Sequence, residues 1–138
     1  MVAVLDNQLL AVLDLEKEAV NCVKDLVLTS NVASVKVLPD SSKVVLGLVE
    51  GKCVIEVING SSCDSFRFKC HREPTTFSSI PTTCFTVNST DYCSAKQLLV
   101  TSGSDGTVAL WSILTKQKLQ IVKFEDKVQT VGMHVRMK

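Results

Sequence analysis

A tight polar turn recurs three times along the chain, and this recurrence constrains the fold more than any other feature. The turns are Asp6-Asn7-Gln8, Glu50-Gly51-Lys52 and Asp105-Gly106-Thr107. Each joins two short apolar runs, and Gly or Asn supplies the positive φ that a two-residue hairpin turn demands. Asn7 and Gly51 are 44 residues apart, and Gly51 and Gly106 are 55 apart. A structural unit of about 45 residues, once with a lengthened loop, is therefore expected to repeat.

The apolar segments around these turns have the length and composition of β-strands. They are short, rich in Val, Ile, Leu and Thr, and separated by polar clusters, whereas helical spacing is scarce. Strand is preferred for residues 9–23, where a helix is the alternative. The expected strands are residues 2–5, 9–13, 19–27, 32–38, 43–49, 53–58, 64–70, 82–87, 97–102, 107–113, 118–124 and 128–135. The predicted fold class is all-β, and the period indicates four-stranded blades of a partial β-propeller.

Length and composition limit the function classes. The 138 residues suffice for one domain with a hydrophobic core, and 46% hydrophobic and 21% charged residues with a net charge of +1 are typical of soluble globular proteins. This charge gives no electrostatic footprint for DNA or RNA, and the phenylalanines are spaced as buried strand residues rather than as a stacking platform. No direct nucleic-acid partner and no membrane partner are expected, because every apolar run is too short to span a bilayer.

The reactive side chains do not form a catalytic or metal site in the sequence. Six cysteines are present without a C-x-x-C pair, and His71 and His134 are isolated, so reduced thiols, no metal and no cofactor are expected. Nucleophile elbows, phosphate-binding glycine loops and His-Glu-x-x-His are missing from the sequence. We therefore expect a protein that is not an enzyme.

The strand ends carry a degenerate two-residue signature. About six residues after each turn stand Leu13-Asp14, Val57-Ile58 and Trp111-Ser112. The run Gly103-Ser104-Asp105-Gly106, followed by a β-branched strand ending in Trp111, resembles the hairpin between the second and third strands of a blade in WD-repeat propellers. In that family the aromatic packs between neighbouring blades and an Asp after it fixes a turn, so Trp111 and Asp14 are the positions that keep the signature.

A second run narrows the resemblance. Phe68-Lys69-Cys70-His71-Arg72, with Glu50-Gly51-Lys52 upstream, resembles two related seven-bladed propellers: the spindle-checkpoint branch of the budding-uninhibited-by-benzimidazole type and the messenger-RNA export branch of the nuclear pore. Three features favour the checkpoint branch: Glu56, a short stretch at 72–80, and Lys116-Gln117-Lys118-Leu119. The resemblance spans about residues 9–124 and implies about three four-stranded blades of a seven-bladed ring.

The resemblance implies a non-catalytic interaction scaffold. Its partners would be checkpoint kinases at kinetochores, or other proteins that carry an acidic GLEBS-type peptide. It would be located in the nucleus and at the kinetochore, or in the cytoplasm. The alternatives are a nuclear-pore export factor and a truncated or divergent propeller without activity of its own. The expected peptide-binding residues are Lys52, Lys69, His71 and Arg72, and the blade signature comprises Gly103, Ser104, Asp105, Gly106 and Trp111. For Lys69, His71 and Arg72 a purely structural or solvated role is the alternative.

The expected blades cover only part of such a ring. Their approximate limits are residues 1–28, 32–70 and 80–124, with the start of a further blade at 127–138. A closed seven-bladed ring needs on the order of 300 residues at this period. A chain of this extent leaves strand edges open at both ends, so we expect either a fragment of a longer propeller or a ring completed by a partner, and poor stability or self-association of the chain alone.

Overall fold

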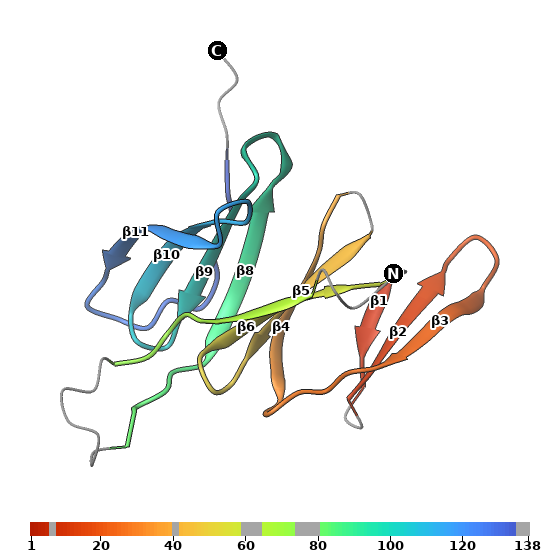
Figure 1. Cartoon of the computed structure of the whole chain (residues 1–138), viewed down its shortest axis with the longest axis horizontal. Helices are drawn as coiled ribbons and strands as arrows, with labels where there is room; N and C mark the ends of the chain where they lie inside the picture. The colour runs from red at the N-terminus through yellow and green to blue at the C-terminus, as the bar shows by residue number, and fades with distance from the viewer. Residues whose placement is uncertain (6–7, 40–41, 59–64, 74–80, 135–138) are drawn as a thin grey trace.

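The chain folds into three antiparallel sheets that follow one another along the sequence (Figure 1). The computed structural model describes residues 1–5, 8–39, 42–58, 65–73 and 81–134. The first sheet contains β1 (Val2–Val4), β2 (Leu9–Asp14) and β3 (Ala19–Asp25). The second contains β4 (Val32–Val37), β5 (Lys43–Leu48), β6 (Lys52–Val57) and β7 (Phe66–Lys69). The third contains β8 (Val87–Cys93), β9 (Leu98–Gly103), β10 (Thr107–Ser112) and β11 (Gln117–Lys123), with a short 3₁₀ turn, η2 (Ser94–Lys96).

Each sheet is a simple meander, in which every strand pairs with its neighbour in the sequence. The all-β class predicted from the sequence is confirmed, and residues 9–23 form two strands rather than a helix. The first sheet has three strands among the described residues and the other two have four. The two complete sheets also share an irregularity, because β4 and β8 shift register at the same point, between Val32 and Ser34 and between Val87 and Ser89.

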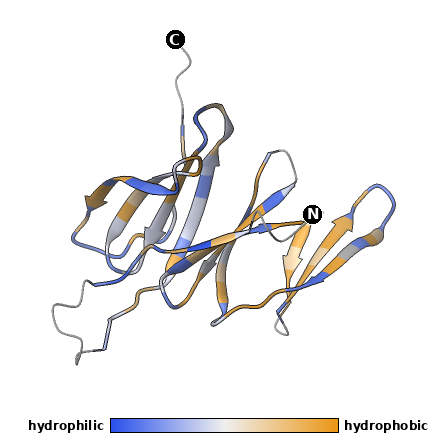
Figure 2. Ribbon diagram, in the orientation of Figure 1, coloured by the Kyte–Doolittle hydropathy of each residue, from blue (hydrophilic) through white to orange (hydrophobic). Residues whose placement is uncertain are grey.

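Two expected strands are wrong. Residues 82–87 form a single bridge, between Cys84 and Arg72, and the strand begins only at Val87. The first strand of the third sheet, β8, lies on the inner edge of that sheet, next to β4. It was not predicted because its sequence VNSTDYC is largely polar, as its white and blue colouring in Figure 2 shows. The described part of the other segment, 128–134, forms no strand, because no strand of its own sheet lies beside it.

The second sheet is covered on both faces, which accounts for the nearly continuous burial of β5 and β6. Side chains of a strand alternate between its faces. Val44, Leu46 and Leu48 therefore pack with Leu10 and Leu26 of the first sheet, while Val45 packs toward the third sheet. Each fully buried Val or Leu contributes about 1.5–3 kcal/mol relative to exposure. Two cores, one at each junction, thus hold the three sheets side by side.

The recurrent turns occupy equivalent places in the three sheets. Gln8, Gly51 and Gly106 all have positive φ, of 62°, 71° and 75°. Their carbonyl oxygens each accept a backbone hydrogen bond from the residue just after the outer strand, namely Leu26, Cys70 and Phe124, at 2.8–2.9 Å. The turns at Gly51 and Gly106 are confirmed. Asp6 and Asn7 of the first turn lie outside the described residues, as does Pro74 of the loop after Arg72.

The described residues contain no helix long and apolar enough to cross a bilayer. Cys53, Cys70, Cys84 and Cys93 are free thiols. The hydrogen bond between Cys53 and Cys70 raises the pKa of the Cys53 thiol well above its usual value, and burial of the thiol adds to this effect. This thiol therefore behaves as a small apolar side chain of the core.

Replacing Gly51 tests the turn geometry. In Gly51→Ala, a Cβ would lie 2.2 Å from the carbonyl oxygen of His71, on a residue whose φ is +71°. We expect the free energy of unfolding to fall by about 2 kcal/mol or more, measured by urea denaturation. Gly132→Ala is the matched control, because a Cβ there meets nothing within 4 Å. Equal stability of the two variants would contradict the assigned turn.

Candidate functional site

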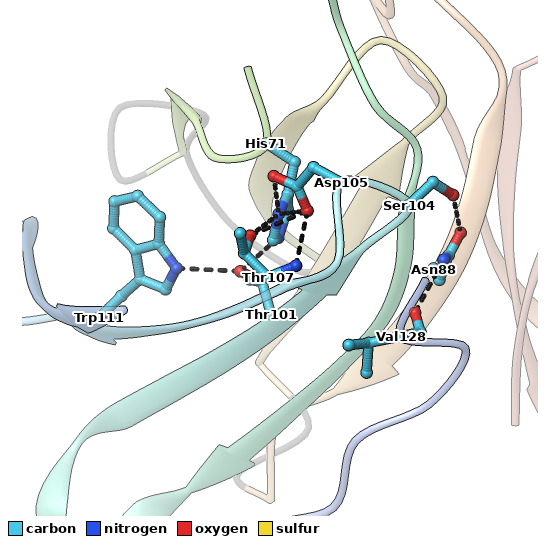
Figure 3. Close-up of polar contacts among 8 residues, drawn as sticks. All are labelled: His71, Asn88, Thr101, Ser104, Asp105, Thr107, Trp111 and Val128. Carbon is cyan, nitrogen blue, oxygen red and sulfur yellow. Dashed lines mark hydrogen bonds and ion pairs between the residues drawn. The ribbon is translucent and has the colours of Figure 1, made fainter. Parts of the chain in front are cut away.

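A buried hydrogen-bond network joins the second sheet to the third (Figure 3). His71 follows β7, and its imidazole Nε2 lies 2.9 Å from the hydroxyl of Thr101 in β9. The same hydroxyl accepts the indole N–H of Trp111 in β10 at 3.0 Å. On the other side of the ring, Nδ1 lies 3.0 Å from the carboxylate of Asp105. His71 and Thr101 have no exposed surface.

The network fixes the proton positions on the imidazole. The carboxylate of Asp105 can only accept, so the ring proton is assigned to Nδ1, which donates to it. In the neutral imidazole Nε2 is then the acceptor, so the Thr101 hydroxyl donates to Nε2 while it accepts the indole N–H of Trp111. Burial lowers the pKa of His71, and the negative charge of Asp105 opposes this effect without overcoming it. His71 is accordingly neutral at physiological pH.

The turn at Asp105 is shaped by the same carboxylate. Its Oδ1 accepts the backbone N–H of Thr107 at 3.0 Å and the Thr107 hydroxyl at 2.8 Å. Gly103 lies directly against the imidazole, since a Cβ there would be 2.4 Å from Nδ1 of His71. Ser104 donates its hydroxyl hydrogen bond to Asn88 of β8 at 3.1 Å. Each residue from Gly103 to Gly106 therefore has a structural role, and that of Gly106 is to form the turn with its positive φ.

Trp111 performs the packing expected of the signature aromatic. Its ring lies 4.8 Å from that of Phe68 in β7, centroid to centroid, with a tilt of 56°. Asp14 also acts as expected, because its Oδ1 accepts the backbone N–H groups of Glu16 and Lys17 and so fixes the turn after β2. Ser112 uses its hydroxyl in the same way toward Thr115.

In the second sheet the expected signature position is wrong by one residue. Val44 pairs with Glu56 as Leu99 pairs with Trp111, so Glu56 and not Val57 stands in the place of the tryptophan. Counting about six residues from the turn overshot the strand by one position. Glu56 is buried and forms an ion pair with Lys24 of the first sheet, with 2.6 Å between Lys24 Nζ and Glu56 Oε1. Lys24 also donates to the Val57 carbonyl at 2.8 Å, so a salt bridge links the first two sheets.

The other predicted site residues gather around the Gly51 turn. Glu50 accepts hydrogen bonds from Lys52 at 2.9 Å and from the Thr29 hydroxyl, and its Oε2 lies 3.6 Å from the Arg72 guanidinium. Arg72 also donates to the Glu50 carbonyl at 2.9 Å. Desolvation disfavours ionisation of Glu50, but the hydrogen bonds from Thr29 and Lys52 and the nearby cations together hold its pKa below the usual value.

Lys69 lies next to this cluster. It pairs in register with Lys52 across β6 and β7 and is exposed, while Lys52 and Arg72 are partly buried. Three cations therefore share one end of the second sheet with a single carboxylate, Glu50. A groove of about 570 Å³ continues from Arg72 along the third sheet, past Phe85 and Asp105 to Lys118 and Lys127.

The structure separates the four predicted peptide contacts into two groups. Lys52, Lys69 and Arg72 reach the surface around Glu50, whereas His71 is completely buried and has both ring nitrogens bonded within the protein. Sequence reasoning missed Thr101, Thr107 and Thr29, which are common strand and loop residues without a distinguishing pattern. The one feature that could have identified Thr101 from the sequence is its position, two residues before Gly103.

The exposed charges at the Gly51 turn are suited to recognition. Among the described residues, no group of three or more His, Cys, Asp or Glu side chains could hold a metal ion. The imidazole of His71 is shielded from any substrate. The accessible polar groups at the Gly51 turn are three cations and one carboxylate, a combination that suits the binding of an acidic ligand.

Thr101→Val tests the network at its shared hydroxyl. The substitution keeps the side-chain shape but leaves Trp111 Nε1 and His71 Nε2 buried without their partner. We expect a loss of about 2 to 4 kcal/mol in the free energy of unfolding, measured by urea denaturation, because each orphaned group costs about 1–3 kcal/mol. Thr115→Val makes the same change at an exposed position and should have little effect. Similar losses in both variants would refute the role of this hydroxyl.

The neutral imidazole also predicts a pH dependence. Below pH about 6.5 the histidine of the unfolded chain takes up a proton, whereas the lowered pKa keeps folded His71 neutral to lower pH. The unfolded state then binds more protons, so the free energy of unfolding should fall between pH 7.5 and 5.5, before carboxylates titrate. His134→Gln, at an exposed histidine, should leave this loss unchanged. Equal stability at both pH values would rule out a buried neutral His71.

Comparison with known proteins finds similar sequences, each much longer than the part that matches this chain. No family model matches the chain. Protein Rae1 of Drosophila melanogaster is 40% identical over 83 residues, which are 59% of this chain and 23% of that protein. An mRNA export factor of Sus scrofa is 36% identical over 77 residues, 54% of this chain and 21% of the relative. The chain thus spans less than a quarter of these curated relatives.

Solved structures agree with the sheet arrangement. A structure of U3-55K superposes with a TM-score of 0.72 over 94% of this chain and 37% of that one, at 14% identity. The WD40 repeats of RRP9 superpose with a TM-score of 0.71 at the same coverage and identity. At this identity the likeness establishes the fold. The chain therefore has the fold of successive blades of a WD40-repeat β-propeller, and in sequence it resembles Rae1 and the mRNA export factors.

Proposed function

We propose that the chain is the peptide-binding part of a messenger-RNA export propeller and binds an acidic segment of a partner protein at the Gly51 turn. The observation that carries the proposal is the group of Lys52, Lys69 and Arg72 around one carboxylate, Glu50, at one end of the second sheet. The names of the relatives, Rae1 and mRNA export factor, support the export assignment. In this proposal the protein acts in the nucleus, at the nuclear pore, and without catalysis.

The cations are arranged for carboxylate binding. Glu50 is an internal ligand that orients both Lys52 and Arg72, which reduces the entropy lost when a peptide carboxylate binds. The Nε atom of Arg72 is buried and has no acceptor among the described residues, so a peptide at the surface would meet the terminal nitrogens of this guanidinium instead. A charge-assisted hydrogen bond contributes about 1.5–3 kcal/mol when it is desolvated.

The peptide class proposed is the acidic GLEBS type. The groove of about 570 Å³ that leads from Arg72 gives an extended segment room along the boundary of the second and third sheets. Three further lysines line this groove together with four acidic residues: Lys118, Lys123, Lys127, Glu73, Asp105, Glu125 and Asp126. Lys52 takes the place of an arginine in the related propellers, and a lysine lacks the planar fork for bidentate carboxylate binding. The affinity is therefore expected to be moderate.

The spindle-checkpoint function stays a second hypothesis. It rests on Glu56, on the short stretch at 72–80 and on Lys116-Gln117-Lys118-Leu119. In the structure Glu56 belongs to the junction of the first two sheets, where Lys24 pairs with it. Checkpoint kinases and pore proteins would present related acidic peptides to the same surface, so the two hypotheses share a site and differ in the partner. We propose blades at 1–28, 32–70 and 80–124 as the frame of this site, in line with the sheets at 2–25, 32–69 and 87–123.

Calorimetric titration with GLEBS peptides tests the site. We expect Lys52→Gln and Arg72→Gln each to weaken binding about tenfold, the equivalent of about 1.4 kcal/mol. Glu50→Gln should strengthen binding, because the amide oxygen can still accept from both cations while the competing negative charge is removed.

The control is Lys17→Gln, which removes a lysine that also lies near a carboxylate, Asp14, at 3.8 Å. Lys17 lies after β2, at the end of that strand opposite the Gln8 turn. The Gln8 turn is the equivalent of the Gly51 turn, so Lys17 is far from the proposed site. Unchanged affinity in the Lys52 and Arg72 variants would remove them from the site. Preference for a pore-protein peptide over a checkpoint-kinase peptide would support the export assignment, and the reverse preference would overturn it.

A further inference from the structure

The connection between the first two sheets brings a hydroxyl group to the cations of the second sheet. Thr29 lies in residues 26–31, which join β3 to β4. Its hydroxyl donates a hydrogen bond to the Glu50 carboxylate and accepts one from the Lys52 ammonium at 3.3 Å. The same carboxylate lies 3.6 Å from the Arg72 guanidinium. Thr29 is therefore a member of this charge cluster, although it belongs to a different part of the chain.

The backbone on both sides of Thr29 is hydrogen-bonded to the rest of the fold. Before it, the backbone N–H of Leu28 donates to the side-chain oxygen of Gln8 at 3.1 Å. After it, the carbonyl oxygen of Asn31 accepts the backbone N–H of Val49 at 3.0 Å, just before the turn of the second sheet. A group attached to the Thr29 hydroxyl would therefore be held beside the cations.

Thr29 is also the residue of this connection that offers a hydroxyl to a modifying enzyme. It is exposed to solvent. The hydroxyl of the next residue, Ser30, is buried and has no hydrogen-bond partner among the described residues. An enzyme that acts on this connection would therefore reach the hydroxyl of Thr29 and not that of Ser30.

A phosphate group on Thr29 would cancel the charge of the cluster. Lys52, Lys69 and Arg72 face the single carboxylate of Glu50, which leaves an excess of two positive charges, three minus one. Phosphothreonine carries a charge of about −1.5 to −2 near neutral pH and three strong acceptor oxygens. It also lacks the hydroxyl proton that Thr29 donates to Glu50. The phosphate would therefore displace the carboxylate and become the internal partner of Lys52 and Arg72.

We propose that Thr29 is a regulatory phosphorylation site, and that its phosphate closes the cation cluster to acidic peptides. The inference rests on the proposed function and adds the regulation of the same site. A protein kinase would transfer the γ-phosphoryl group of a nucleoside triphosphate to Thr29 Oγ1. The bond from the γ-phosphorus to the bridging oxygen breaks, the nucleoside diphosphate leaves, and the base of the kinase accepts the hydroxyl proton. Hydrolysis of the ester by a phosphatase releases inorganic phosphate and restores the hydroxyl.

Mass spectrometry of the protein isolated from cells that make it, treated with a phosphatase inhibitor, tests the modification. We expect phosphate on Thr29. The modification should be lost in Thr29→Val and retained in Ser30→Ala, which removes the buried hydroxyl next to it. A protein that stays unmodified at Thr29 under these conditions would overturn the proposal.

Phosphorus NMR of the chain with phosphothreonine incorporated at position 29 tests the contact with the cations. The second pKa of a phosphate ester is about 6, and a nearby positive charge lowers it because the dianion is favoured. We expect the phosphate at position 29 to titrate below that pH. Lys52→Gln in the same phosphorylated chain should move the titration back toward it. An ordinary titration in both chains would overturn the proposal, because the phosphate would then lie away from the cluster.

Calorimetric titration with a GLEBS peptide tests the regulation. Phosphothreonine at position 29 should weaken binding about tenfold or more, since the phosphate engages two cations of the site. The control carries phosphothreonine at Thr115, an exposed residue after β10, at the end of that strand opposite the Gly106 turn. It adds the same charge and should leave the affinity unchanged.

The titration separates this inference from the proposed function. If the unmodified chain binds the peptide and phosphate at Thr29 leaves the affinity unchanged, the inference is overturned and the proposed function stands. If the unmodified chain binds no acidic peptide, the proposed function is overturned, and the regulation of that site with it.

Discussion

The Thr101 hydroxyl is the central atom of the buried polar network at the junction of the second and third sheets. It accepts from the Trp111 indole and donates to the His71 imidazole, so one buried oxygen connects three segments. The network constrains the neighbouring sequence: Gly103 must lack a Cβ because the ring lies against it, and residue 105 must supply an acceptor for Nδ1 and for Thr107. Since an unsatisfied buried group costs more than a bond contributes, the members stabilise the fold only together.

The junction of the first and second sheets solves the same problem with different chemistry. Glu56 replaces the tryptophan, and Lys24 reaches across from β3 to pair with it at 2.6 Å. A largely buried ion pair contributes little net stability, because desolvation offsets much of the attraction. Apolar packing of Leu10 and Leu26 on Leu46 must therefore provide most of the cohesion here. The two junctions keep one architecture although only one retains the tryptophan.

Sequence patterns predicted the elements that local chemistry determines. The Gly51 and Gly106 turns could be predicted because a positive φ there requires glycine, and the alternating strand around Trp111 showed one buried face. β8 was missed because an innermost strand, packed against neighbouring strands of the same kind, needs no apolar alternation. The register of Glu56 and the proton donor to His71 depend on pairing between strands distant in sequence, which no local pattern contains.

The buried network and the exposed cations are adjacent in sequence, and this adjacency connects stability to recognition. His71 is held between the sheets, so the next residue, Arg72, must emerge at their boundary, beside the Gly51 turn. Glu50, at that same turn, then holds Arg72 and Lys52 in fixed positions. In the proposed site, His71 therefore has its effect only through the position that it gives to Arg72. The surface around Glu50 is rigid because the residue behind it cannot move without breaking bonds to Thr101 and Asp105.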